Sequence, residues 1–168
     1  MKYLRVLAVL AFLVIVQTTL LPRLFPWLPL APAFLYLVVL SFRLPRNFLL
    51  TAGLWSGLVQ DILVGEVFGL TMFTNYIAMA VVWEFKDDLL DNAVVTCGVR
   101  VVIATLVQEF LTAFVYYIYS AGSGHISNTL QISAGLNLLS NLLLYALFML
   151  WLRLRGSEKV SAFLEARS

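Results

Sequence analysis

Charged residues are scarce in this sequence: Asp, Glu, Lys and Arg make up 12% of its 168 residues, whereas hydrophobic residues make up 62%. A soluble domain is typically about 45–50% apolar and roughly a quarter charged. A chain with so few polar groups cannot cover its apolar surface in water, and its mean hydropathy of +0.95 agrees with this. The composition therefore excludes a soluble globular protein and predicts an integral membrane protein.

Cysteine and histidine are almost absent. Cys97 and His125 each occur once, which excludes a disulfide within the chain and leaves no set of side chains that could bind zinc. The formal net charge of +2 is too small to indicate a nucleic-acid partner. No nucleophile–base pair, phosphate-binding loop or metal-ligand spacing occurs either, so the sequence predicts neither an enzyme nor a bound cofactor or metal.

The hydrophobic residues are gathered in six segments, and none of them alternates with the period of two that a barrel strand requires. The first segment follows a basic N-terminus, as in a signal peptide, but it is long and no small-x-small cleavage site precedes Pro22, so we interpret it as a retained span. We therefore predict an all-α integral membrane protein with six transmembrane helices in residues 1–154 and a short cytoplasmic tail in residues 155–168. The six segments are residues 4–21, 30–42, 47–64, 68–83, 93–120 and 130–154.

The second, third and fourth segments are near or below the length of about 20 residues that a helix needs to cross the hydrocarbon. The second is the shortest, and Pro32 lies near its start, where a helix tolerates proline best. These segments are either short spans in a locally thinned bilayer or partly re-entrant helices, and the sequence leaves both alternatives open.

Lys and Arg are distributed unevenly among the loops. With six spans and the N-terminus inside, nine basic residues are cytoplasmic and only Arg23 lies outside, so the positive-inside rule predicts that both termini are cytoplasmic. Arg100 lies within the fifth segment, and we expect its side chain to snorkel to the inner surface rather than to be buried. The nine residues are Lys2, Arg5, Arg43, Arg46, Lys86, Arg153, Arg155, Lys159 and Arg167.

Small residues recur every four positions around an acid, in the order Gly53, Gly57, Asp61, Gly65 and Gly69. Residues four apart lie on one face of a helix, so the first two glycines form a stripe that lets another backbone approach closely. An ionised acid facing lipid at mid-bilayer costs about 2.5–3.5 kcal/mol, so Asp61 is expected to face protein. It either hydrogen-bonds within the hairpin or belongs to a partner interface or polar pocket.

Six further polar residues lie within the apolar segments. One interpretation is that they form hydrogen bonds between helices. The alternative is that they line an interior pocket, since ligand sites place a few polar groups among apolar walls. The six are Gln60, Asn75, Gln108, Glu109, Asn137 and Asn141.

The stretch "GLWSGLVQDILVGEVFGLTMFTNYIAMAVV", residues 53–82, resembles the signature of the rod shape-determining MreD family. It has the G-x-x-x-D core at Gly57 and Asp61, the glycine turn at Gly65, and the G-L pair at Gly69 and Leu70. The preceding "LAPAFLYLVVLSFRLPRN" also resembles the proline-led second span and basic loop of that family. Length and the six-segment layout agree, so the resemblance covers nearly the whole chain.

This resemblance implies a non-catalytic scaffold of the cell-elongation machinery, located in the bacterial inner membrane. It further implies an MreC-like bitopic partner and, through it, the MreB filament and the peptidoglycan synthase of RodA and its penicillin-binding protein. It also implies a fold similar to the substrate-binding subunits of energy-coupling-factor transporters. We hypothesise that the third and fourth spans help to build the docking surface for the partner's helix. The alternative function is a substrate-binding membrane subunit of a small-molecule or lipid transporter.

Overall fold

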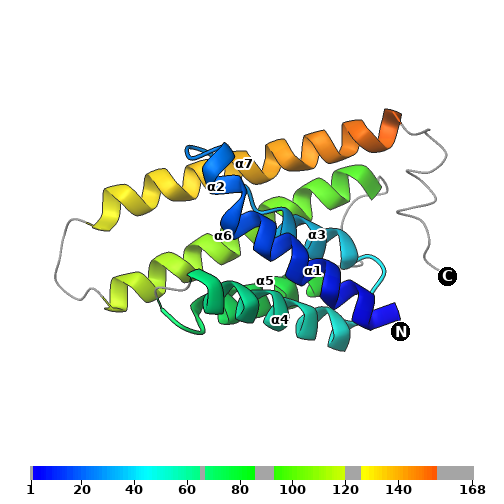
Figure 1. The fold of residues 1–168 in the computed structure, drawn as a ribbon, viewed down its shortest axis with the longest axis horizontal. Coiled ribbons are helices and arrows are strands. Elements are labelled where there is room, and N and C mark those ends of the chain that lie inside the picture. Colours follow the sequence, from blue (N-terminus) through cyan, green and yellow to red (C-terminus); the bar gives the residue numbers. More distant parts are fainter. Residues whose placement is uncertain (1, 65–66, 86–92, 120–125, 155–168) are drawn as a thin grey trace.

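The computed structural model describes residues 2–64, 67–85, 93–119 and 126–154, and every regular element within them is a helix. This confirms the predicted all-α class. The predicted turn at Gly65 and Glu66 and the predicted tail of residues 155–168 lie outside the described residues. In chain order the helices are α1 (Lys2–Thr19), α2 (Leu21–Leu24), α3 (Pro32–Leu40), α4 (Arg46–Val64), α5 (Leu70–Glu84), α6 (Ala93–Tyr119) and α7 (Ile126–Leu154) (Figure 1).

The six predicted segments correspond to six of these helices, and the short α2 is an addition that the sequence did not indicate. Among the described residues, three helical stretches are long and apolar enough to cross a membrane: Tyr3–Leu24, Arg46–Val64 and Val95–Ile118. A shorter apolar stretch, Gly135–Leu150, lies within α7. The helix α3 has 9 residues and α5 has 15, whereas a helix needs about 20 residues to cross the hydrocarbon of a membrane. Six helices are therefore confirmed, but six complete spans are not.

The shortest of the six, α3, occupies the centre of the bundle. It packs against α1, α4, α5, α6 and α7, and seven of its nine residues are buried. Leu37 and Val38 are fully buried there, together with Leu10 of α1, Leu49 of α4 and Met79 of α5. At a rise of 1.5 Å per residue, α3 extends only about 14 Å, so it fills one half of the bundle and leaves the other half without a central helix.

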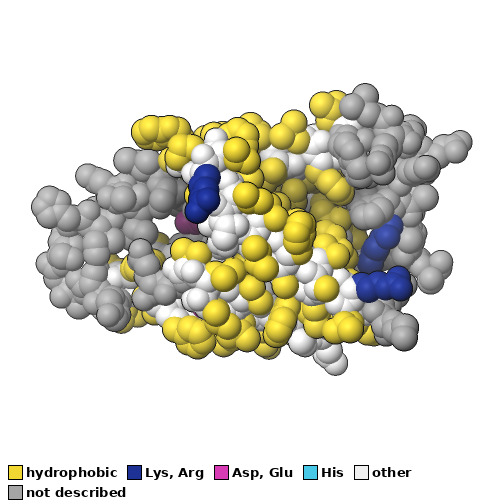
Figure 2. Space-filling model, in the orientation of Figure 1, with side chains coloured by type: hydrophobic (Ala, Val, Ile, Leu, Met, Phe, Trp, Pro, Cys, Tyr) yellow, Lys and Arg dark blue, Asp and Glu magenta, His cyan; other side chains and the backbone are white. Residues whose placement is uncertain are grey.

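The start of α1 and the end of α7 lie at the same end of the bundle (Figure 1). Arg46, the first residue of α4, forms an exposed ion pair of 2.8 Å with Glu84, the last residue of α5. Figure 2 shows basic side chains at this end and a mostly hydrophobic surface over the middle of the molecule. Such a band of apolar surface bordered by charge is what a bilayer requires of a protein that it surrounds.

The expectation that Arg100 snorkels to the surface is wrong. Its side chain is only 1% exposed, in the core between α6 and the end of α3. The guanidinium lies 4.0 Å from the centroid of the Phe42 ring, and Nη1 donates a hydrogen bond of 3.3 Å to the Ser41 hydroxyl. A cation buried in this way is stabilised by the face of an aromatic ring and by a hydrogen-bond acceptor, and residues just after α3 supply both.

The glycine stripe faces α5, and α4 packs against α5 more extensively than any other pair of helices. A Cβ atom placed on Gly57 would lie 2.4 Å from the Cα of Met72, so no side chain fits between the two backbones. A Cβ on Gly53 would meet the Asn75 carbonyl oxygen at 3.2 Å. The Gly53–Gly57 stripe therefore packs within the protein, against the backbone of α5.

Asp61 lies at the end of this seam, where only 4% of it is exposed. Its carboxylate accepts hydrogen bonds from the backbone N–H groups of Thr71, at 3.1 Å, and Met72, at 3.0 Å. These N–H groups belong to the first turn of α5 and have no partner within the helix. The N-cap residue, Gly69, has a φ of +89° and no side chain that could accept them. Asp61 thus caps α5 from α4, and the prediction that it hydrogen-bonds the hairpin is confirmed.

Replacing Gly57 with alanine should separate α4 from α5, because the added methyl group overlaps the backbone at Met72. Overpacking of this kind costs about 1–3 kcal/mol of unfolding free energy. Unfolding in mixed detergent micelles would measure the loss. Gly135→Ala is the matched control, because a Cβ there meets nothing within 4 Å. If Gly57→Ala unfolded like the control, the close approach of α4 and α5 would be contradicted.

Replacing Asp61 with alanine leaves two N–H groups of α5 without an acceptor, at a cost of about 1–3 kcal/mol for each one buried from water. Asp61→Asn keeps one side-chain oxygen and should lose less. The same unfolding measurement applies. Glu84→Ala provides the control, since an exposed ion pair contributes only about 0–1 kcal/mol. Equal losses from Asp61→Ala and Glu84→Ala would show that the cap contributes nothing specific.

Candidate functional site

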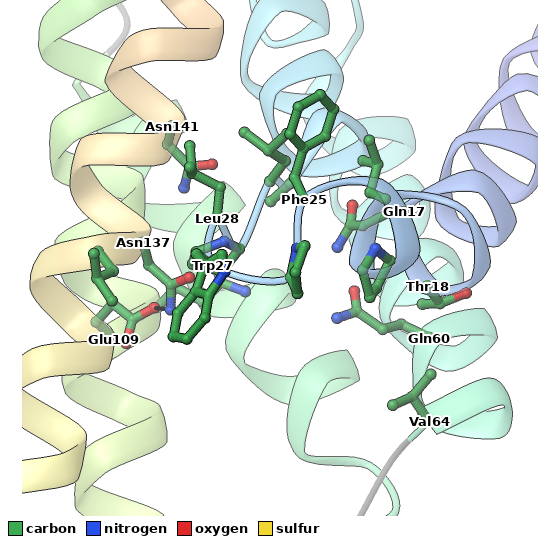
Figure 3. Close-up of a pocket in the computed structure, with 18 residues that line it drawn as sticks. Gln17, Thr18, Phe25, Trp27, Leu28, Gln60, Val64, Glu109, Asn137 and Asn141 are labelled. Carbon is green, nitrogen blue, oxygen red and sulfur yellow. Dashed lines mark hydrogen bonds between the residues drawn. The ribbon is translucent and has the colours of Figure 1, made fainter.

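A cavity of about 590 Å³ lies in the half of the bundle that α3 leaves unfilled. One wall is formed by the end of α1, by α2 and by the segment of residues 25–31 that leads into α3. The opposite wall comes from α6 and α7, and the end of α4 contributes Gln60 and Val64 (Figure 3). Its volume lies within the range of about 300–1,000 Å³ that is usual for ligand pockets.

The cavity brings together most of the polar residues singled out from the sequence. Five of the six line it: Gln60, Gln108, Glu109, Asn137 and Asn141. The sixth, Asn75, lies behind this lining, and its Oδ1 accepts a hydrogen bond of 3.2 Å from Gln108 Nε2. The stripe of Gly53, Gly57, Asp61 and Gly69 does not line the cavity, so the two predicted groups of residues serve separate places in the fold.

The sequence did not indicate the cavity wall that is formed by the end of α1, by α2 and by residues 25–31. Gln17 and Thr18 at the end of α1 line the cavity, and so do the aromatic residues Phe25 and Trp27. Gln17 Oε1 also accepts a hydrogen bond of 3.4 Å from the backbone N–H of Ala33, which joins α1 to the first turn of α3. The one available signal was the stretch "LPRLFPWLP", whose prolines and aromatic residues mark an irregular segment between two apolar helices.

One chain of hydrogen bonds connects the cavity lining to the α4–α5 seam. Gln108 of α6 donates to Asn75 of α5, and Asn75 Nδ2 donates to the Ser56 hydroxyl of α4 at 3.3 Å. The Ser56 hydroxyl donates in turn to the Gly53 carbonyl at 3.0 Å. This confirms that polar residues in these segments join helices, as membrane proteins commonly use them.

A second set of hydrogen bonds joins α6 to α7 along the cavity wall. Asn137 Nδ2 donates to Glu109 Oε1, and Asn141 Nδ2 donates to the Thr105 hydroxyl at 3.1 Å. The Thr105 hydroxyl has one proton, which it donates to the Val101 carbonyl at 2.8 Å, so it can only accept from Asn141. The orientation of the Asn141 amide is thereby fixed. Its Oδ1 has no hydrogen-bond partner, although only 3% of the residue is exposed.

The cavity lies between two groups of helices. Within the described residues, α1 packs against α2, α3 and α4, whereas α7 packs against α3 and α6. Neither α1 nor α2 packs directly against α7, so the two walls face each other across the cavity. In the part of the chain that the structure describes, no group of three or more His, Cys, Asp or Glu side chains is placed to hold a metal ion. The cavity thus combines hydrogen-bonding groups with apolar surface, as ligand sites do.

Comparison with known proteins assigns the family. A family model described as rod shape-determining protein MreD matches residues 1–155. No curated protein and no solved structure matches the chain, so the expected similarity to energy-coupling-factor transporter subunits stays a prediction. The family match covers the glycine stripe, the Asp61 cap and the whole cavity lining. The chain belongs to the family of the rod shape-determining protein MreD.

Proposed function

We propose that this protein is a non-catalytic scaffold of the cell-elongation machinery in the bacterial inner membrane. Membership of the MreD family implies a role in rod shape determination, and the match over residues 1–155 is the observation that carries the proposal. The described chain consists almost entirely of apolar helices, which act on other membrane proteins through their faces. The nine basic residues predicted to be cytoplasmic support an orientation with both termini inside the cell.

The proposed partner is an MreC-like protein with one transmembrane helix, which connects the scaffold indirectly to an MreB filament and to a RodA–penicillin-binding-protein synthase. The docking surface was hypothesised on the third and fourth spans, which are α4 and α5. Because the glycine stripe of α4 already packs against α5, the surface of this hairpin that is left for a partner helix is its outer side. Large aromatic side chains are exposed there: Trp55 on α4 by 40%, and Phe73 and Tyr76 on α5 by 50% and 37%. Aromatic residues dominate the binding energy of many interfaces.

Affinity purification of the tagged chain from its native host in mild detergent tests the proposal. We expect an MreC-like bitopic protein to be recovered together with the chain. Recovery of a transporter ATPase in place of a bitopic protein would contradict the scaffold and favour a substrate-binding transporter subunit. The cavity is the specific observation in favour of that second function, since its size and mixed lining are those of a small-molecule site.

Variants of the hairpin surface locate the interface. Trp55→Ala and Phe73→Ala should each reduce recovery of the partner by about fivefold or more, because truncating a central aromatic residue typically costs more than 1 kcal/mol of binding. Phe110→Ala, which changes an equally large exposed side chain on α6, is the matched control and should leave recovery unchanged. If Phe110→Ala were the only variant to reduce recovery of the partner, the partner would bind on α6. Asp61 and Gly57 are unsuitable probes, because their replacement disrupts the hairpin itself.

A further inference from the structure

The two walls of the cavity hold opposite hydrogen-bonding groups towards its interior. At the end of α1, Gln17 Oε1 accepts a hydrogen bond from the backbone N–H of Ala33, which fixes the orientation of the amide. The Nε2 group, with its two N–H donors, is therefore the part of this side chain that is left for the cavity. Figure 3 shows the nitrogen atom of Gln17 turned towards the side of the cavity on which Trp27 lies. The α1 wall thus presents donors.

Gln60 of α4 adds a second amide on the same side of the cavity (Figure 3). The residue is half-buried, and among the residues that the structure describes its side chain has no hydrogen-bond partner. Gln108, by contrast, donates to Asn75. A polar group removed from water is costly unless it is hydrogen-bonded. The Gln60 amide therefore joins no helices through hydrogen bonds, and both its N–H donors and its oxygen are open to a ligand.

The opposite wall presents an acceptor. Asn137 of α7 uses its Nδ2 group to donate to Glu109 Oε1, so Asn137 Oδ1 is left for the cavity that both residues line. Figure 3 shows this oxygen on the side of Asn137 that faces Trp27. Of the described residues that line the cavity, none is Lys or Arg, whereas Glu109 is acidic. The lining therefore offers amide donors on one side, an amide oxygen on the other, and no positive charge.

We propose that this cavity binds an uncharged molecule that carries an amide group on an apolar body. The amide carbonyl accepts hydrogen bonds from Gln17 and Gln60, and the amide N–H donates to Asn137 Oδ1. The apolar body lies against the apolar part of the lining, which includes Phe25 and Leu136. The inference goes beyond the scaffold function and does not depend on it, because it rests on the cavity alone.

Other polar groups match only one of the two walls. A carboxylate has acceptors alone, so it leaves Asn137 Oδ1 without a donor and meets Glu109 without a basic residue to offset its charge. An ammonium group has donors alone and leaves the N–H groups of Gln17 without an acceptor. A hydroxyl group donates and accepts from a single atom, so it cannot face two walls at once. An amide places its acceptor and its donor on two different atoms of one small group.

The test compares benzamide with benzoate, benzylamine and benzyl alcohol, which share one ring and differ in the polar group. The unfolding temperature of the purified, delipidated full-length protein in detergent is measured at increasing concentrations of each, because a ligand that binds the folded state raises it. We expect the Kd of benzamide to be at least about tenfold lower than that of the other three, since each of them leaves a polar group of the cavity unpaired. Binding of any of the three as tight as that of benzamide would overturn the proposal.

The amide can come from a small soluble molecule or from a lipid with an amide head group. Dodecanamide, which carries the same group on a lipid-like chain, is therefore titrated alongside benzamide. Stabilisation by benzamide would support a soluble ligand, and stabilisation by dodecanamide alone would support a lipid. If neither amide raised the unfolding temperature, the proposal would be wrong.

Three variants assign the preference to the cavity. Gln60→Leu should reduce the preference for benzamide over benzylamine by about fivefold, and Asn137→Leu should reduce the preference over benzoate by a similar factor. Asn47→Leu also removes an amide, at an exposed position of α4 outside the cavity, and should retain both preferences. Unchanged preferences in Gln60→Leu would overturn the proposal.

Gln60→Leu breaks no hydrogen bond between described residues, so this variant is expected to fold. If a cavity variant fails to fold, the comparison of the four probes in the unmodified protein still decides. Recovery of the bitopic partner is measured separately, so failure of one proposal is distinguishable from failure of the other.

Discussion

The backbones of α4 and α5 lie so close together at Gly57 that not even a Cβ atom fits between them. Much of this fold depends on that close approach. Gly57 permits the approach, and one turn later Asp61 uses it to bind the first N–H groups of α5. Neither residue is sufficient alone: a side chain at position 57 would hold the helices apart, and without the carboxylate a glycine-capped helix would begin with unpaired N–H groups. With α5 fixed in this way, Asn75 can reach both Ser56 of α4 and Gln108 of α6.

The length of α3 determines where the interior is solid and where it is hollow. Nine residues suffice to pack against five neighbouring helices in one half of the bundle, where the apolar core and Arg100 lie. Beyond the N-terminus of α3 the chain is irregular, and its prolines and aromatic residues form one side of the cavity instead of filling it. A short central helix and a polar cavity are therefore two results of the same feature of the chain.

The sequence predicted the features that follow from local spacing. The four-residue period of Gly53, Gly57 and Asp61 indicated a close hairpin, and the isolated amides indicated hydrogen bonds between helices. The burial of Arg100 was not predictable, because it depends on Phe42 and Ser41, which lie far away in the chain and meet it only after folding. The wall formed around Trp27 escaped prediction for a related reason: an irregular segment has no period from which its position can be read.

The uneven packing also has a consequence for motion. At the end where α3 lies, moving α1 relative to α7 means disrupting the packing of a helix that touches both. At the level of the cavity no direct helix packing joins α1 to α7, so there the same displacement breaks few contacts. Regions with few buried contacts open at the lowest free-energy cost. The bundle should therefore behave as a clamp that is rigid at the α3 end and compliant at the cavity, and whatever occupies the cavity would set the spacing of the helices around it.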